Sequence, residues 1–172
     1  VPRIALVNKM DRIGANFGNV VEMMKDRLGA NAYPVQYPLG EGELFTGVVD
    51  IVERKSIIYE DEMGSQFTES EIPSGLQDKV EELSQELLEA AVEHDDDLLE
   101  KYLSGEELTN DEFRHAIRAA TIKGVLFPVF CGSAFKNKGV QRLLDGVVDY
   151  LPSPLDVKDV EGTDLKGEAT SR

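Results

Sequence analysis

The sequence predicts an α/β fold, in which an open sheet carries an inserted α+β subdomain. Two short apolar runs, at residues 4–7 and 125–131, are rich in β-branched and aromatic residues, as buried strands are. Each run ends in a polar loop, and a helix with one apolar face follows each loop. The stretch between them, residues 29–124, has a different pattern and is expected to fold as a separate unit.

The first segment covers residues 1–28. Its strand is predicted at 4–7, and Asn8-Lys9-Met10-Asp11 follows as a polar loop. After Gly14, apolar residues recur at helical spacing, and Gly29 stands where a C-terminal helix cap belongs. The apolar positions of this helix are Phe17, Val20, Val21, Met24 and Leu28.

A small sheet is predicted at the start of the insertion. Residues 29–43 are expected to form turns, because glycine and proline interrupt them repeatedly. Two strands are predicted over 45–52 and 56–59, joined by a turn. The acidic stretch 60–74 reads as a loop with one more short strand.

Three helices are predicted for the rest of the insertion. The first begins near Leu76 and has an acidic face opposite its apolar face. Asp95-Asp96-Asp97 is expected to start the second helix, since negative charge is favourable at a helix N-terminus. Thr109 and Glu112 have the spacing of a capping box for the third helix, which Gly124 ends. The residues of the acidic face are Asp78, Glu81, Glu82, Gln85, Glu86 and Glu89.

The last segment covers residues 125–154. Its strand tolerates Pro128 near the start and ends in Gly132-Ser133-Ala134-Phe135. A final helix follows and stops at Pro152. Its predicted apolar face consists of Val140, Leu143, Leu144, Val147, Val148 and Leu151. The tail, 155–172, is rich in Pro, Gly and Asp and reads as a linker toward another domain.

Composition excludes several classes of protein. The 172 residues include 18 Lys+Arg and 33 Asp+Glu, for a net charge of −15, and much of the acidic surplus lies in the insertion. So acidic a chain is not expected to bind nucleic acid directly, because such binding depends on Lys and Arg. No membrane span is expected, since no run of eighteen apolar residues occurs. The single cysteine, Cys131, indicates a reducing compartment, and we expect a cytoplasmic location.

The two loops at the strand ends have the chemistry needed to bind guanine. A carboxylate at Asp11 can accept hydrogen bonds from guanine N1–H and N2–H₂ together, a pair that adenine does not offer. Asn8 can contact the base and brace the second loop, and the stem of Lys9 can cover one face of the base. The backbone N–H of Ala134 can approach guanine O6, and Ser133 is placed to hold the Asp11 loop. Both loops follow strands, and ligands of open α/β sheets bind there.

Asn-Lys-x-Asp alone is a weak signal, because four residues with one wildcard recur by chance as a solvated turn. Its position before a helix, together with a Ser-Ala turn after a later strand, makes the interpretation more specific. No catalytic residue and no metal site is expected in this chain. His94 and His115 lack partners at ligand spacing, and residues 95–97 lack the rest of a calcium loop.

Three segments resemble the elongation factor G family of translational GTPases: NKMDRIGANF, HDDDLLEKYLSGEELT and FCGSAFKNKGVQRLLDGVVDYLPSPLD. The resemblance implies a partial P-loop-GTPase-like Rossmannoid sheet. It also implies that Asn8, Lys9 and Asp11 form the guanine-specificity motif. Ser133 and Ala134 would belong to the last nucleotide loop.

Phe135 departs from the wider GTPase pattern. Many small GTPases have a Lys at this position, packed on the base, whereas here Lys136 comes one residue later. An aromatic ring can also cover a base, so either side chain is a candidate for this contact.

The resemblance also implies cofactors and partners. The cofactor would be GTP or GDP, and the inserted subdomain would dock the ribosomal stalk protein of the large subunit. A basic partner would suit the acidic helix face, although the same carboxylates also fit a simple solvated surface. Other open alternatives are a ribosomal-protection or release-factor type of translational GTPase, and a pure protein-interaction module over residues 30–124.

The sequence contains no GxxxxGK[ST] phosphate loop. The family places that loop and its Mg²⁺ ligand upstream of the base motif, so we expect this chain to be a fragment without the catalytic half. Such a fragment would bind GDP weakly and would not hydrolyse GTP. Its first strand would have an unpaired edge open to self-association, and its last helix would lack packing partners.

Overall fold

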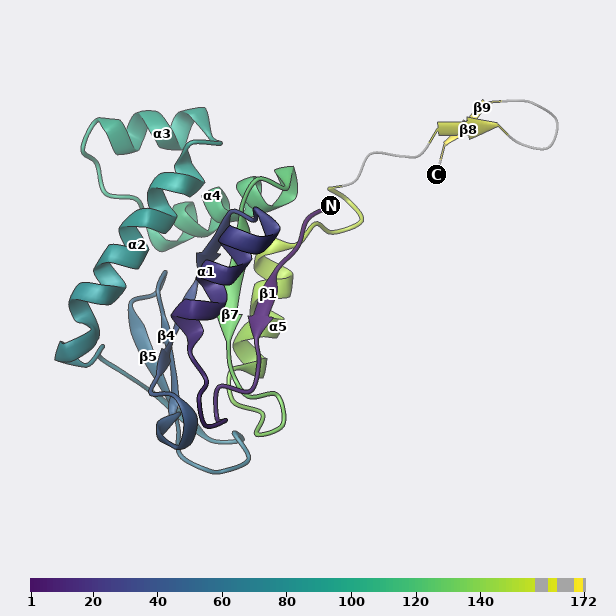
Figure 1. Cartoon of the computed structure of the whole chain (residues 1–172). Coiled ribbons are helices and arrows are strands. Elements are labelled where there is room, and N and C mark those ends of the chain that lie inside the picture. Colours follow the sequence, from purple (N-terminus) through teal and green to yellow (C-terminus); the bar gives the residue numbers. More distant parts are fainter. Residues whose placement is uncertain (157–160, 164–168, 172) are drawn as a thin grey trace.

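The computed structural model describes residues 1–156, 161–163 and 169–171. Its first sheet is parallel and has the order β1-β7-β2, with β1 at Ala5–Val7, β7 at Phe127–Cys131 and β2 at Ala32–Pro34 (Figure 1). Val7 lies opposite Cys131 in the β1–β7 register. The two strands therefore end side by side, which brings the loops that follow them to the same edge of the sheet.

Helices cover both faces of this sheet (Figure 1). Helix α1 (Phe17–Leu28) lies on one face, where Phe17 packs in a cluster with Val129 and Cys131. On the other face, Phe130 packs against Tyr150 of α5 (Val140–Tyr150), with the ring centroids 6.3 Å apart. Alternate residues of β7 thus supply two different cores, as the two-residue period of a strand dictates.

The second sheet is an antiparallel meander with the order β3-β4-β5-β6. Its strands are β3 (Gln36–Leu39), β4 (Gly47–Asp50), β5 (Lys55–Tyr59) and β6 (Phe67–Ser70). The two strands and the further short strand predicted between residues 45 and 74 are therefore confirmed. β4 ends earlier than predicted because Oδ1 of Asp50 accepts the backbone N–H groups of Val52 and Glu53, which turns the chain.

The expectation that residues 29–43 form only turns is wrong. This stretch contains β2 and β3, separated by Val35, and the 3-10 turn Gly42–Leu44. Pro34 and Pro38 lie within these strands. Both strands are at the edge of their sheets, where a residue without an N–H group does not interrupt a ladder between two neighbours.

The three helices of the insertion are α2 (Gln77–Val92), α3 (Asp96–Leu103) and α4 (Asn110–Lys123). The caps of α3 and α4 are as the sequence predicts. The Asp95 side chain accepts the N–H of Leu98, and Thr109 and Glu112 form the complete capping box. The predicted acidic face of α2 is exposed, while Leu87 and Ala91 on its other face are fully buried.

Helix α5 buries only part of its predicted apolar face. Leu144 is 60% exposed and Val148 is 76% exposed, while Val140 and Leu143 are half-buried. The buried residues of the helix, Gly146 and Tyr150, lie outside the predicted face. In the part of the chain that the structure describes, β1 is also an outer strand of its sheet.

Beyond residue 156, the structure describes only β8 (Glu161–Thr163) and β9 (Ala169–Ser171), which pair antiparallel. The rest of the predicted linker lies outside the described residues. No helix in the described ranges has the length and hydrophobicity that crossing a bilayer requires.

Candidate functional site: two loops at the carboxyl ends of β1 and β7

Two backbone hydrogen bonds connect the loops that follow β1 and β7, and so extend the pairing of these strands beyond their ends. The N–H of Gly132 donates to the carbonyl of Val7 at 3.1 Å, and the N–H of Met10 donates to the carbonyl of Gly132 at 3.1 Å. The Asn-Lys-Met-Asp loop and the Gly-Ser-Ala-Phe loop are therefore neighbours at the same edge of the sheet. The sequence predicts this arrangement.

Asn8 links the two loops through its side chain. Its Oδ1 accepts the backbone N–H of Ala134 at 3.0 Å and the N–H of Lys9 at 2.8 Å. One side-chain oxygen thus fixes a residue of each loop. The same bond occupies the Ala134 N–H, the group for which a contact with guanine O6 is expected.

Asp11 lies beside Ser133 and Lys136. A hydrogen bond from the Ser133 side chain lowers the pKa of the Asp11 carboxyl, and the Lys136 ammonium, 3.8 Å from Oδ2, adds to the effect. Ser133 itself is only 1% exposed. The lowered pKa keeps Asp11 ionised, as a carboxylate that accepts hydrogen bonds from a base must be.

Met10, the variable position of the motif, anchors the first loop. Its side chain is 1% exposed and packs in a cluster with Phe17 and Phe45. Lys9, just before it, has a left-handed φ of 64° and is exposed. The buried methionine and the turn at Lys9 leave Asn8, Lys9 and Asp11 at the surface around one anchored residue.

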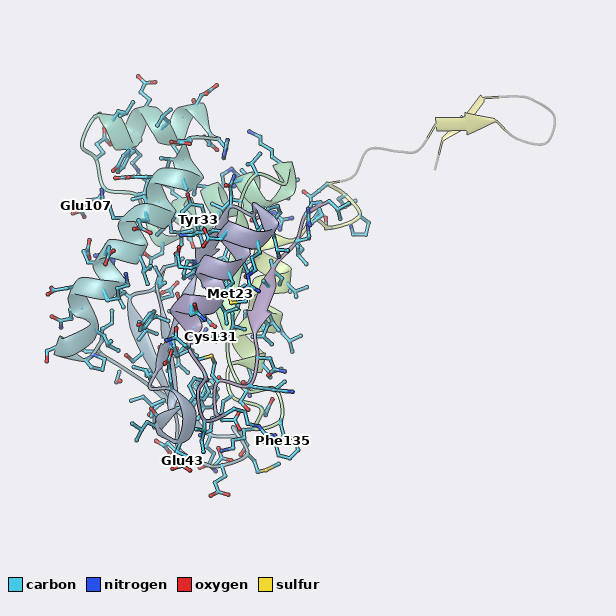
Figure 2. All side chains as sticks on the ribbon, in the orientation of Figure 1. Met23, Tyr33, Glu43, Glu107, Cys131 and Phe135 are labelled. Atoms are coloured by element: carbon cyan, nitrogen blue, oxygen red, sulfur yellow. The ribbon has the colours of Figure 1, made fainter. Side chains whose placement is uncertain are left out.

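Phe135 is 92% exposed, whereas the Lys136 side chain points to Asp11. An open hollow next to them is lined by Asp11, Arg12, Ile13, Glu43, Phe135 and Lys136. Figure 2 shows Phe135 and Glu43 at the same end of the molecule, with Cys131 in its interior. Ile13 and Glu43 extend the predicted site. No motif in the sequence marks Ile13, and Glu43, which is distant in the sequence, lies next to the site loops only in the folded chain.

The loop between β3 and β4 supports the first site loop. The N–H of Gly42 donates to the carbonyl of Met10 at 2.8 Å. Oε1 of Glu41 accepts the N–H of Phe17 at 2.9 Å, which satisfies a free donor at the start of α1. Sequence reasoning misses this support, because residues 29–43 are predicted only as turns.

The site provides one carboxylate, one amide, backbone N–H groups, a lysine stem and an exposed ring, all of which suit a flat heterocycle with a donor edge. Within residues 1–156 and the two short strands after them, no cluster of three His, Cys, Asp or Glu could hold a metal ion. Cys131 is fully buried, and burial raises the pKa of its thiol, which makes it an inert core residue.

Comparison with known proteins agrees with this chemistry. Residues 1–153 match the family described as Elongation factor Tu GTP binding domain. The chain belongs to this family. Its α/β architecture is accordingly that of a P-loop-GTPase-like domain, and guanine nucleotides are the ligands that the family binds.

One solved structure is also similar to this chain. It is the crystal structure of a protein from Thermus thermophilus, with 34% sequence identity and a TM-score of 0.80. The match covers 92% of this chain and 24% of that protein. The chain thus spans about a quarter of the length of the protein that it matches.

Proposed function

We propose that this chain recognises the guanine base of GTP and GDP within a translational GTPase of the elongation factor G type. The observation that carries the proposal is the bond between Asn8 and Ala134, which joins the two loops where β1 and β7 end and brings Asp11 to the same place as Ser133 and Lys136. In this proposal, Asp11 accepts guanine N1–H and N2–H₂. The Lys9 stem covers one face of the base and Phe135 borders the other.

The Ala134 N–H reaches guanine O6 in this proposal by sharing or exchanging its bond to Asn8. That bond is 3.0 Å long and lies at the surface, so a ligand oxygen can compete for the donor. Asn8 also keeps its amide N–H₂ group, which can donate to a base acceptor.

Phosphate binding and hydrolysis are not part of the proposed activity of the chain by itself. The sequence has no phosphate-loop motif, and contacts to phosphate and Mg²⁺ supply much of the affinity of GTPases for nucleotides. We expect the chain to bind GDP weakly and to leave GTP intact, while the whole protein hydrolyses GTP with Mg²⁺. Titration calorimetry with GDP tests this expectation, and submicromolar affinity or measurable GTP turnover would contradict it.

For the insertion, we propose docking of the ribosomal stalk protein through the exposed carboxylates of α2. Glu82 and Glu86 lie on this exposed face, and two ion pairs, formed by Lys79 and Arg54, neutralise it only in part. Capture of a basic stalk domain by the chain tests the proposal. We expect the double charge reversal Glu82→Lys and Glu86→Lys to abolish capture, while Glu22→Lys on α1 leaves it unchanged. Equal capture by all variants would mean that the acidic face only solvates the helix.

The proposed organisation has GTPase segments at 1–28 and 125–154, the insertion at 29–124 and a linker at 155–172. The pairing of β2 with β7 favours a start of the insertion at Val35. A cytoplasmic location and self-association through the edge of β1 complete the proposal.

The alternatives are a ribosomal-protection or release-factor type of GTPase and a protein-interaction module. Selective binding of GDP over ADP would argue against the module.

A further inference from the structure

A tyrosine of the inserted sheet is hydrogen-bonded to the end of the loop that contains Ser133 and Ala134. The hydroxyl of Tyr59, at the end of β5, accepts the N–H of Gly139 at 2.8 Å and donates to Oε1 of Gln141 at 3.3 Å. Tyr59 is 5% exposed, and its bond with Gly139 is shielded from water, while its bond with Gln141 is partly buried. A buried N–H group that loses its acceptor is costly, and the Tyr59 hydroxyl therefore fixes the backbone at Gly139.

Gly139 closes the loop that carries Ser133 and Ala134. Ser133 and Lys138, at the two ends of this loop, exchange two backbone hydrogen bonds of 2.9 and 3.0 Å. The loop is therefore a short closed unit, and Tyr59 holds the residue that immediately follows it. A shift of Gly139 would move both Ser133 and Ala134.

A second contact comes from Gly64, in the connection between β5 and β6. Its carbonyl accepts Nδ2 of Asn137 at 3.3 Å and Nε2 of Gln141 at 2.9 Å. Gly64 has a φ of +60°, and a Cβ atom there would lie 2.6 Å from the carbonyl oxygens of Lys136 and Asn137. The two backbones can approach this closely only with a glycine at this position.

The same sheet also supports the first loop. Gly42, between β3 and β4, donates to Met10, and Tyr59 and Phe45 pack in the same buried cluster as Met10. Both base-recognition loops therefore rest on the β3–β6 sheet, although neither loop belongs to it.

We propose that the inserted β3–β6 sheet positions the guanine site, with Tyr59 and Gly64 as positioning residues. The inference rests on the proposed function and adds to the insertion a role distinct from docking. Since coupling between two sites is reciprocal, a partner that shifts this sheet changes guanine affinity, and guanine binding changes the affinity for that partner by the same factor.

Amide NMR titrations of the full chain with GDP and with ADP test the proposal. Tyr59→Phe removes only the hydroxyl, and we expect GDP to bind about fivefold more weakly, the loss associated with one hydrogen bond. The amide signals of Ser133, Ala134 and Gly139 should shift even without nucleotide. The matched control is Tyr37→Phe on β3, because no hydrogen bond of the Tyr37 hydroxyl occurs among the described residues.

Gly64→Ala provides a second variant that displaces the loop sterically. Its control is Gly105→Ala, at a φ of +82° with no atom within 4 Å of the added Cβ, so the backbone strain is matched and the contact is absent. We expect Gly64→Ala to weaken GDP binding by about tenfold or more, and Gly105→Ala to leave it unchanged. Thermal unfolding shows that each variant is folded.

The ratio of GDP to ADP affinity separates positioning from a loss of folded protein, because partial unfolding weakens both affinities equally. A ratio that falls in Tyr59→Phe and Gly64→Ala supports the inference. Wild-type selectivity for GDP that persists in both variants would overturn it. A wild-type chain that does not distinguish GDP from ADP would instead overturn the proposed guanine recognition, so the two failures are distinguishable.

Discussion

Oδ1 of Asn8 accepts the backbone N–H of Ala134 at 3.0 Å, although the two residues are 126 positions apart in the chain. This bond joins the loop after β1 to the loop after β7, across the whole insertion. It shows why the long stretch between the two loops is compatible with one compact site. β1 and β7 are neighbours in the sheet, while the chain leaves this sheet after β2, on the other side of β7, and returns to it at β7 itself.

Asp11→Asn is expected to change the base specificity from guanine to xanthine. Xanthine has a carbonyl at C2 where guanine has an amino group, so an amide N–H₂ matches xanthine and a carboxylate matches guanine. We expect GDP affinity to fall at least tenfold and xanthosine diphosphate to become the better ligand. Competition titrations with the two nucleotides measure this, with Asp26→Asn on the exposed side of α1 as the control. If Asp11→Asn weakened the affinity for GDP and for xanthosine diphosphate equally, the assigned role of Asp11 would be contradicted.

Asp50 is expected to make the stability of the chain depend on pH. Burial raises the pKa of the Asp50 carboxyl to about 6, and Arg142 only partly offsets this effect. A carboxyl whose pKa is higher in the folded state than in the unfolded chain lowers stability as pH rises from about 4 to about 6. Asp50→Asn keeps the acceptor for Val52 and Glu53 and removes the charge. At pH 7 we expect it to increase the free energy of unfolding by about 3 kcal/mol.

Urea denaturation at pH 4 and pH 7 measures the effect of Asp50→Asn. The gain in stability should be present at pH 7 and largely absent at pH 4. The control is again Asp26→Asn, which exchanges an exposed carboxylate for an amide. An Asp50→Asn variant that is no more stable than the wild type at pH 7 would show that nearby cations compensate the buried charge.

Gly146 permits the close approach of α5 to β7. A Cβ atom at this position would collide with the ring of Phe130, which is only 3% exposed. Gly146→Ala should therefore destabilise the fold by about 1–3 kcal/mol, although alanine is the better helix former. Gly18→Ala on α1, where the nearest atom is 3.8 Å away, should be neutral or stabilising. Thermal unfolding of both variants measures these changes in stability. A Gly146→Ala variant that is more stable than Gly18→Ala would disprove the packing argument.

Local patterns in the sequence predict the helices and their ends. The Thr109–Glu112 capping box, the Asp95 cap and the final Gly29 each depend on residues within one turn of one another, so their meaning does not depend on the rest of the fold. The two site loops are also predictable, because each directly follows an apolar strand.

Long-range contacts account for what the sequence does not reveal. The strands β2 and β3 are hidden by prolines that only an edge position permits, and sheet order is not visible in a sequence. Tyr59 reads as a core residue of a strand, and only the fold brings it 2.8 Å from Gly139. Likewise, the spacing of Leu144 and Val148 predicts an apolar face but not what covers it.

Guanine recognition by the two loops is the central claim, and an amide NMR titration of the wild-type chain with GDP and ADP tests it most directly. We predict weak binding of GDP, with shifts concentrated at residues 8–11 and 133–136, and no comparable shifts with ADP. Shifts that avoid these loops, or equal shifts with both nucleotides, would contradict the account.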